Sequence, residues 1–335
     1  MLDFTSALYL GMRHGARQLE AWSALTEGKP AALKEPPGAR AVAARLAGLA
    51  GCQSGLLFPS TLHLFWDLFC ARAADEPIAI HFDAGLYEVG RWGIQRAAAH
   101  GVPVHRFAHH DVRALAASLE RTPRGRRPIV VTDGGCPRCG QVAPLRRYLE
   151  RVRARGGYLV VDDTQALGLF GGGGGGSLRR LGIRGPEILW CASLAKGFGV
   201  PVAAVAGAAR EIAHIEARSD TRVHTSPPSQ AVISAAARAL TVNSARGPAL
   251  RSRLARNVQR FRAGLLRLGV RAPGSAYPQV NLPVAAPRKL HARLLRRGVR
   301  TVLFRGALGW LLTARHTAAD IDEALRALAA SLSAP

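Results

Sequence analysis

Short apolar runs, several of them rich in Val and Ile, alternate with longer stretches of helical character as far as residue 206. The runs lie at 56–58, 78–82, 103–107, 128–132, 158–161, 188–192 and 202–206. Helices are predicted between several of them, for example over 112–121 and 144–155. Short β-rich runs separated by helices are typical of an α/β fold with a buried, mostly parallel central sheet.

Polar side chains follow the ends of four of these runs. Asp83, Asp133 and Asp162 each come directly after a run, and Lys196 follows the run at 188–192. In an open α/β sheet, ligands bind outside the carboxyl ends of the strands. We therefore expect the chemistry of this protein at that edge of the sheet.

The pattern changes from about residue 231. A helical stripe crosses an Arg-rich segment at Leu250, Leu254, Val258, Phe261, Leu265 and Leu268. Further elements follow at 280–284, 290–297, 299–304, 310–313 and 318–332, of which 290–297 and 318–332 are predicted helices. Together they predict a smaller α+β domain. We expect an N-terminal segment over 1–35, a large domain over 36–238 and a small C-terminal domain over 239–335.

The basic residues are almost all arginine. Only four of the 46 are lysine, namely Lys29, Lys34, Lys196 and Lys289. A guanidinium stays protonated and cannot form a Schiff base. A lysine kept at the end of a buried strand is therefore a candidate for amine chemistry, although a surface lysine beside a glycine turn fits the same residues.

The formal net charge of +24 has three interpretations. Nucleic-acid binding needs Arg and Lys against phosphates, but the arginines are spread along the chain without a recognisable zinc-finger, basic-zipper or RNA-binding motif. Arg-rich codon usage and solvated helix faces explain the same composition. Attraction of an acidic partner, such as coenzyme A or an acyl carrier protein, is the third. We expect no specific nucleic-acid partner.

Other features concern the cellular compartment. No charge-free apolar run reaches membrane-spanning length, so we expect no membrane span. Residues 1–5 lack the basic start and apolar core of a secretory signal. The five cysteines are odd in number and scattered, which suggests reduced thiols rather than a disulfide framework. We expect a cytoplasmic protein.

Lys196 and Asp162 together indicate a cofactor, because each follows a buried apolar run. Pyridoxal 5'-phosphate needs such a pair: a lysine amine holds its aldehyde as an imine, and a carboxylate keeps its pyridine nitrogen protonated. A buried Asp is tolerated there because it faces the pyridinium charge. Asp162 or Asp163 capping the following turn is the structural alternative.

Six segments of the chain are similar to the motifs of one protein family and follow one another in the same order as in that family. Two of them contain VVDDTQALG and SLAKGFG. The six segments lie at 2–11, 106–112, 158–168, 193–199, 225–231 and 315–322. In these segments the chain resembles the α-oxoamine synthases, which are fold-type-I pyridoxal phosphate enzymes. The resemblance implies a PLP-dependent transferase fold of type I, whose large domain binds the cofactor.

The resemblance also implies roles for matching residues. Lys196 would hold the cofactor aldehyde and later move the substrate α-proton, and Asp162 would contact the pyridine nitrogen. Ser193 stands where the family has a hydroxyl that touches the cofactor phosphate.

The phosphate cradle of the family is matched by Ser60, Thr61 and Leu62. Backbone and hydroxyl donors in such a turn suit a dianion. Near Thr225 the family reaches the cofactor phosphate of the partner subunit, so the resemblance implies an obligate homodimer.

Several positions depart from the family pattern. Tyr87 stands in place of the ring-stacking His; it can stack but cannot act as an imidazole proton donor. Gln165 replaces a His near the phenolic oxygen of the cofactor and can donate a hydrogen bond without charge. With Lys196, these two are the candidate catalytic residues. Pro137 replaces a Ser of the family.

The arginines that clamp a substrate carboxylate in the family are largely missing. Arg305 aligns with one of them and is the candidate substrate residue, with a plain surface arginine as the alternative. Cys136 and Cys139 form a single C-x-x-C, which supplies only half of a structural zinc site. We expect no metal and a reshaped substrate loop.

The expected function is therefore a PLP-dependent acyltransferase of α-oxoamine synthase type. It would condense the carbanion of an amino acid or amine with an acyl thioester of coenzyme A or an acyl carrier protein. Aminotransfer or decarboxylation is the first alternative, because Lys196 and Asp162 serve these reactions equally. A catalytically eroded binding or scaffold homologue is the second, suggested by the altered positions.

Overall fold

The computed structural model describes residues 1–274, 276–304 and 306–333. They form two compact units. The sheet unit contains Arg13–Gly135 and Val142–Asn243, and the C-terminal unit contains Met1–Met12, Cys136–Gln141 and Ser244–Pro335. The functional domains that the sequence suggests, over 36–238 and 239–335, stay a prediction.

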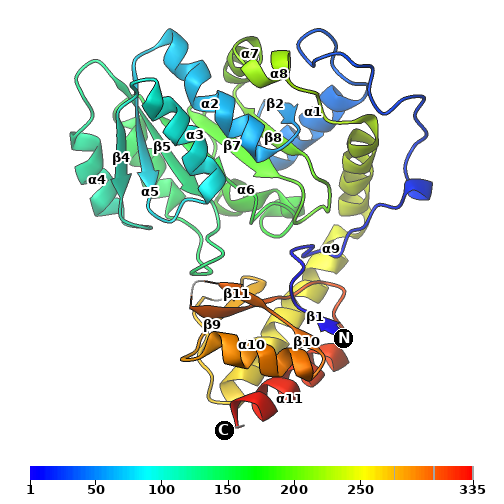
Figure 1. Ribbon diagram of the computed structural model, residues 1–335. Helices are drawn as coiled ribbons and strands as arrows, with labels where there is room; N and C mark the ends of the chain where they lie inside the picture. The colour runs from blue at the N-terminus through cyan, green and yellow to red at the C-terminus, as the bar shows by residue number, and fades with distance from the viewer. Residues whose placement is uncertain (275, 305, 334–335) are drawn as a thin grey trace. The chain divides into compact units, whose positions relative to one another are not determined.

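The sheet unit is built on seven strands in the order β2-β8-β7-β6-β5-β3-β4 (Figure 1). Strand β8 is antiparallel to both of its neighbours, β2 and β7, and the other four strand pairs are parallel, so the predicted mostly parallel sheet is confirmed. Each strand overlaps one of the apolar runs: β2 (Ser54–Phe58), β3 (Ile78–Asp83), β4 (Val104–Phe107), β5 (Arg127–Asp133), β6 (Tyr158–Asp162), β7 (Ile188–Ser193) and β8 (Ala203–Gly207).

Helices pack against this sheet, and α2 and α3 cross in front of it in Figure 1. All residues of β6 and β8 are buried, which explains why these runs are apolar throughout rather than alternating. The helices are α1 (Ala39–Ala50), α2 (Thr61–Asp75), α3 (Glu88–Ala99), α4 (Val112–Glu120), α5 (Leu145–Arg153), α6 (Gly176–Leu181), α7 (Ala209–Ala217) and α8 (Asp220–His224), with a 3-10 turn at Ala16–Gln18.

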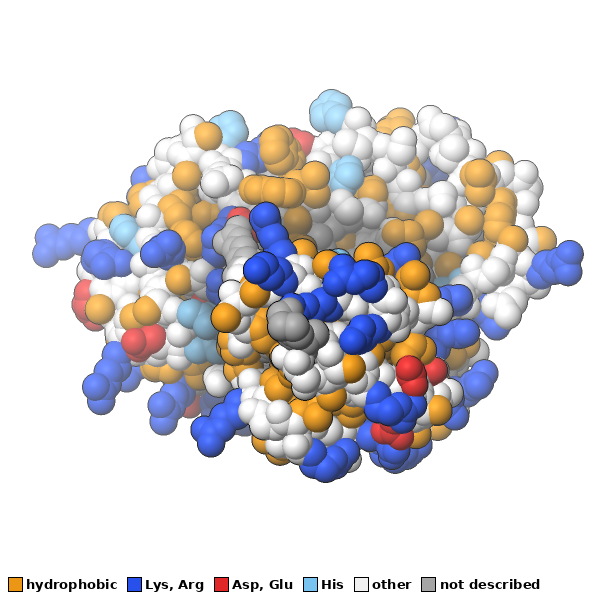
Figure 2. All heavy atoms as spheres, turned by 60° about the horizontal axis from the view of Figure 1, so that its bottom comes forward, with side chains coloured by type: hydrophobic (Ala, Val, Ile, Leu, Met, Phe, Trp, Pro, Cys, Tyr) orange, Lys and Arg blue, Asp and Glu red, His pale blue; other side chains and the backbone are white. Residues whose placement is uncertain are grey.

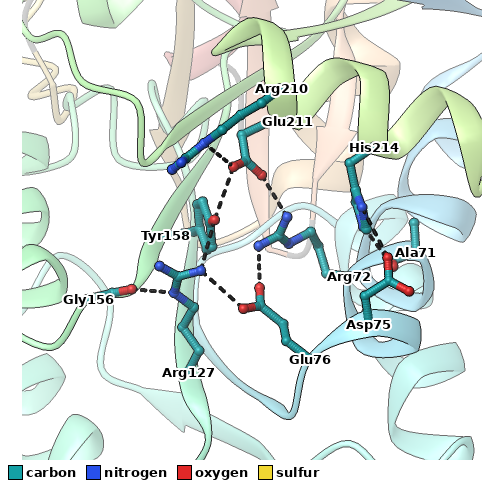
Figure 3. A network of polar contacts seen from close by, with 10 residues as sticks. All are labelled: Ala71, Arg72, Asp75, Glu76, Arg127, Gly156, Tyr158, Arg210, Glu211 and His214. Atoms are coloured by element: carbon teal, nitrogen blue, oxygen red, sulfur yellow. Dashed lines mark hydrogen bonds and ion pairs between the residues drawn. The ribbon is translucent and has the colours of Figure 1, made fainter.

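A network of charged side chains ties the starts of β5 and β6 to α2 and α7 (Figure 3). Buried Arg72 donates to Glu211 over 2.6 Å and also contacts Glu76. Tyr158 donates its hydroxyl proton to Glu211 over 3.1 Å, and Arg127 donates to both Tyr158 and Glu76 over 3.0 Å. Buried charges are tolerated when their partners satisfy them in this way. The network thus fixes the starts of β5 and β6, at the other end of these strands from Asp133 and Asp162.

The six-glycine run at 171–176 contains a 3-10 turn at Gly172–Gly174 and is partly buried. Gly174 to Gly176 are buried, and Gly176 has a φ of +91°, which favours glycine. A Cβ on Gly176 would overlap the Asp163 carboxylate, and one on Gly175 would overlap the Leu49 carbonyl. Glycine is needed at positions 175 and 176 because backbone and carboxylate approach too closely there for any side chain.

The C-terminal unit contains an antiparallel sheet in the order β11-β12-β9 and the parallel pair β1-β10. The predicted run at 299–304 is divided into two short strands. The elements are β1 (Leu2–Asp3), α9 (Gln230–Arg267), β9 (Gln279–Pro283), α10 (Pro287–Arg296), β10 (Val299–Arg300), β11 (Val302–Phe304), β12 (Ala307–Leu311) and α11 (Ala318–Leu332). Helix α9 starts well before the apolar stripe and contributes residues to both units.

The beginning of the chain belongs to the core of the C-terminal unit. Strand β1 pairs with β10, with Leu2 opposite Val299. The fully buried ring of Phe4 lies 5.1 Å from that of Trp310, edge to face. In the described part of the chain, no helix combines the length and the apolar character needed to cross a membrane.

Candidate active site

The carboxyl ends of neighbouring strands bring acidic residues side by side. Asp133 at the end of β5 is paired in register with Asp162 at the end of β6. Asp162 is in turn opposite Cys191 on β7, the strand that leads to Lys196. This edge is where an α/β sheet binds ligands.

Asp162 is buried and held by Thr164. The Thr164 backbone N–H donates to Asp162 Oδ1 over 3.0 Å, and Thr164 Oγ1 accepts from the Ser193 N–H over 2.9 Å. Burial raises the pKa of the Asp162 carboxyl above its ordinary value, while Thr164 and the Lys196 ammonium act in the opposite direction. A cation placed against Asp162 would therefore stabilise its ionised form.

Lys196 lies in the turn that follows β7 and is partly exposed. Burial lowers the pKa of its amine below the ordinary lysine value, and the nearby Asp162 and Asp133 carboxylates oppose this shift. The turn is tight, because a Cβ on Gly197 would overlap the Leu167 carbonyl. A lysine with a lowered pKa has a larger neutral fraction and is a better nucleophile.

Tyr87 presents its ring to this lysine. Lys196 Nζ lies 5.3 Å from the centroid of the Tyr87 ring. Tyr87 precedes α3, and its backbone N–H donates to Asp133 Oδ1 over 3.3 Å. Tyr87 is 51% exposed, so its side chain is accessible to a ligand.

Asp83 builds the turn from which Tyr87 projects. Its carboxylate accepts from the Gly85 N–H over 2.6 Å, from the His110 N–H over 3.0 Å, and from His109 Nδ1 over 2.6 Å. Burial raises its pKa, but these hydrogen bonds prevail and hold the pKa of Asp83 below its ordinary value. Asp83 therefore stabilises the turn, and Tyr87, which follows in the sequence, places its aromatic ring at the site.

Hydrogen-bond donors suited to a phosphate gather at the start of α2. Ser60 is extended and precedes the helix, which begins at Thr61, and Leu62 is 41% exposed. The first N–H groups of a helix have no acceptor within it, and Leu64 is the residue whose N–H bonds back to Ser60. Ser60 Oγ also lies 2.9 Å from His63 Nδ1. Such a helix start favours an anion.

The remaining expected residues are placed less directly. Gln165 is buried in the turn after Asp163. Ser193 Oγ accepts from the Ala195 N–H over 3.2 Å. Thr225 follows α8 and donates its hydroxyl proton to the Thr221 carbonyl over 2.6 Å, so that proton is already engaged. Arg305 lies outside the described residues.

Three residues of the site were not predicted as site residues. The Asp133 carboxylate raises the pKa of Lys196 and accepts a hydrogen bond from the Tyr87 N–H. The signal available in the sequence was its place at the end of a strand, like that of Asp162. Thr164 joins Asp162 to Ser193, and His63 contacts Ser60. No periodicity marks Thr164 or His63, because their contacts depend on how the strands and helices assemble.

The chemistry of these groups fits pyridoxal 5'-phosphate. An amine with a lowered pKa suits its aldehyde, and a buried carboxylate that gains from a cation suits its pyridinium. An aromatic face suits the ring, and a helix start suits the phosphate. All these residues belong to the sheet unit.

Known proteins resemble this chain over most of its length. It is 34% identical over 241 residues to the 8-amino-7-oxononanoate synthase of Halorhodospira halophila. This match covers 68% of this chain and 59% of the relative. The enzyme of the same name from Methylococcus capsulatus is also 34% identical over 241 residues, covering 68% and 62%. The matches thus span about three fifths of the curated relatives.

Solved structures share the fold at lower identity. A serine palmitoyltransferase from S. paucimobilis superposes with a TM-score of 0.89 at 19% identity, covering 98% of this chain and 86% of that one. An 8-amino-7-oxononanoate synthase from Francisella tularensis gives a TM-score of 0.80 at 16% identity, covering 99% and 98%. The predicted α/β fold of PLP-dependent transferase type I is confirmed.

One family spans both units. Residues 94–328 match aminotransferase class I and II, a segment that includes Asp162, Lys196 and the C-terminal elements through most of α11. The chain belongs to the aminotransferase class I and II family.

Proposed function

We propose that this protein is a pyridoxal phosphate-dependent acyltransferase that condenses an amino acid or amine with an acyl thioester. The observation that carries the proposal is the position of Lys196, whose Nζ lies 5.3 Å from the centroid of the Tyr87 ring and whose pKa is raised by the charge of Asp162 against the effect of burial. When bound, the cofactor supplies an electron sink that stabilises negative charge on the substrate α-carbon.

The chain's own residues then have distinct tasks. Lys196 Nζ would hold the cofactor aldehyde and would take the substrate α-proton, for which a lowered pKa is favourable. Asp162 would favour a protonated ring nitrogen through its charge. Tyr87 would orient the ring by stacking. Ser60, Thr61, Leu62 and Ser193 would hold the phosphate, and Gln165 would donate a hydrogen bond to the phenolic oxygen.

Acyl transfer is favoured over other reactions of this cofactor by the names of the relatives. The two quoted from curated proteins are 8-amino-7-oxononanoate synthases, and one structural neighbour is a serine palmitoyltransferase. Because Tyr87 stands in place of an imidazole, we assign the proton transfer to Lys196. We propose Arg305 as the residue that contacts the substrate carboxylate.

Release of free thiol from an acyl-coenzyme A tests the reaction. Protein reconstituted with pyridoxal phosphate is mixed with single amino acids, with thioesters, and with both. Thiol release that needs both substrates supports acyl transfer. A keto acid formed from the amino acid without thioester would identify aminotransfer instead, and carbon dioxide without thioester would identify decarboxylation. A protein that binds no cofactor would be a scaffold homologue. Parallel assays with acyl carrier protein thioesters identify the donor.

We also propose that the protein is a homodimer that works in the cytoplasm. Large apolar side chains are exposed on α2, on α3 and on α8 near Thr225, namely Leu62, Trp66, Trp92 and Val223. A second copy that covers this surface would bring Thr225 toward the partner's phosphate. The five free cysteines agree with a reducing compartment. Light scattering of the purified protein tests the dimer, and a monomeric mass that persists with cofactor would contradict it.

A further inference from the structure

The loop between β5 and α5 carries two cysteines in a closed turn. The Cys136 N–H donates to the Gln141 carbonyl over 2.9 Å, and the Gly140 N–H donates to the Cys136 carbonyl over 2.8 Å. Gly140 has a φ of +69°, a conformation that favours glycine. The turn therefore folds Cys139 back toward Cys136.

The two thiol groups contact one another. The Cys139 backbone N–H lies 3.5 Å from Cys136 Sγ, and the side chains share a hydrogen bond. Cys136 is only 1% exposed, whereas Cys139 is partly exposed. A disulfide needs a sulfur–sulfur distance of about 2.05 Å, so thiols that already share a hydrogen bond need only a short movement to reach it.

The loop is anchored by a side chain of β9, which lies in the same unit. Asn281 Nδ2 donates to the Pro137 carbonyl over 3.0 Å and to the Arg138 carbonyl over 3.2 Å. Asn281 Oδ1 accepts from Gln279 Nε2 over 3.2 Å, which fixes the amide orientation. The peptide groups between the cysteines are thus held, and the thiols are kept adjacent before any reaction.

The other cysteines of the chain lie outside this loop, on or next to other elements, and their thiols are weakly acidic like that of Cys139. Cys191 is buried in β7, and burial raises its pKa well above the ordinary value. Burial raises the pKa of Cys52 to about 11, and burial also raises that of Cys70. These thiols serve as internal controls for reactivity.

We propose that Cys136 and Cys139 form a dithiol–disulfide site that exchanges with a small anionic disulfide, such as glutathione disulfide. The partly exposed Cys139 thiolate attacks one sulfur of the disulfide, whose other sulfur leaves as a thiolate and takes up a proton. Cys136 then loses its proton and attacks Cys139 Sγ, which releases the second thiol. Two protein thiols are oxidised to one disulfide, and one glutathione disulfide is reduced to two glutathiones.

Charge and acidity set how this exchange proceeds. Arg138, between the cysteines, is exposed, and the net charge of +24 attracts an anionic disulfide. The hydrogen bond with Cys136 and partial burial raise the pKa of the Cys139 thiol. Since the thiolate is the attacking species, the raised pKa of Cys139 slows the exchange.

Thiol trapping with mass spectrometry tests the site on the full-length protein. Reduced protein is equilibrated in glutathione buffers of increasing disulfide content, quenched with an alkylating reagent and digested. We expect a disulfide between Cys136 and Cys139, whereas Cys52, Cys70 and Cys191 should form neither a disulfide nor a glutathione adduct. Dithiothreitol should restore the thiols of Cys136 and Cys139. C136S should accumulate glutathione on Cys139, whereas C139S should form no adduct at position 136. The matched control C70S should oxidise as the unaltered protein does.

Three results would overturn the proposal. Cys136 and Cys139 could stay reduced across the whole glutathione series while the protein remains folded by circular dichroism. Glutathione could accumulate on Cys52 or Cys70 instead of Cys139 in C136S. Finally, thiols that become reactive only after a chelator is added would identify a bound metal rather than an exchanging pair. None of these readouts depends on catalysis, so the outcome is independent of the proposed function.

Discussion

Lys196 Nζ lies 5.3 Å from the centroid of the Tyr87 ring, within the range of a cation–π contact. The same ring is proposed to stack on the cofactor. Tyr87→Phe keeps the ring, so we expect its affinity for pyridoxal phosphate to stay within about twofold. Tyr87→Ala should weaken binding by about tenfold, which corresponds to roughly 1.4 kcal/mol, within what an aromatic pair contributes.

The measurement is a cofactor titration followed by visible absorption. The control is Leu266→Ala, which removes an exposed apolar side chain from the part of α9 that belongs to the C-terminal unit. We expect that variant to bind cofactor as the unaltered protein does. Equal affinities for Tyr87→Phe and Tyr87→Ala would show that the ring has no part in binding.

Lys196→Ala should abolish the covalent attachment of pyridoxal phosphate. The visible band of lysine-bound cofactor should disappear, and turnover should fall by about 10³-fold or more, because the proton-transferring group is lost. Borohydride reduction followed by peptide mapping identifies the modified lysine. Lys289→Ala, which removes an exposed lysine from α10, should leave attachment unchanged. Cofactor found on another lysine of the unaltered protein would contradict the assignment.

The fold was predictable because its signals are local. The apolar runs that became β5 and β6 end at Asp133 and Asp162, and each run is short, continuous and followed by a polar residue. The prediction that Asp162 and Lys196 serve one site rests on the same reasoning, because each residue follows a buried strand. Thr164 and Asp133 were missed as site residues because their partners, Ser193 and Tyr87, come from distant parts of the chain. The need for glycine at position 176 could not be predicted, because composition alone does not reveal the nearby Asp163 carboxylate.

Asp163 should make stability depend on pH in an unusual direction. Burial raises its pKa from 3.8 to about 6, although Ser177 and Trp190 donate to it. Between about pH 4 and about pH 6 the folded protein therefore binds more protons than the unfolded chain, and this group's contribution to stability falls as pH rises. At neutral pH the full effect is on the order of 3 kcal/mol against folding.

Thermal unfolding across this window, compared between variants, isolates the effect. Asp163→Asn should remove this component of the slope, whatever its effect on the absolute midpoint. Asp322→Asn is the control: the Asp322 pKa is lowered by its hydrogen bond with Arg260, so its proton binding changes below the window. Identical slopes for the unaltered protein and Asp163→Asn would disprove the assignment.

Gly176→Ala should destabilise the sheet unit strongly. The φ of +91° costs an alanine on the order of 1–2 kcal/mol, and overlap of its Cβ with the Asp163 carboxylate adds about 1–3 kcal/mol. Gly172→Ala, within the same run, is the matched control because its Cβ would meet open space. Urea unfolding should therefore show a loss of about 2–5 kcal/mol for the first variant and little change for the second. Similar losses for both would mean that the run as a whole, rather than contact with Asp163, needs glycine.

The excess of positive charge has a specific distribution. Residues 221–319 contain 18 Lys and Arg residues and no Asp or Glu. Figure 2 shows many Lys and Arg side chains and few acidic ones on the face that it presents. Codon usage rich in Arg adds cations but does not remove acidic residues. This stretch should therefore bind polyanions through charge alone, with an affinity that falls steeply as salt rises. Retention on heparin and on unrelated DNA duplexes, measured against salt, checks this. We expect the same retention for every duplex, because no base-reading motif is present; a preference for one sequence would instead establish the specific nucleic-acid partner that we do not expect.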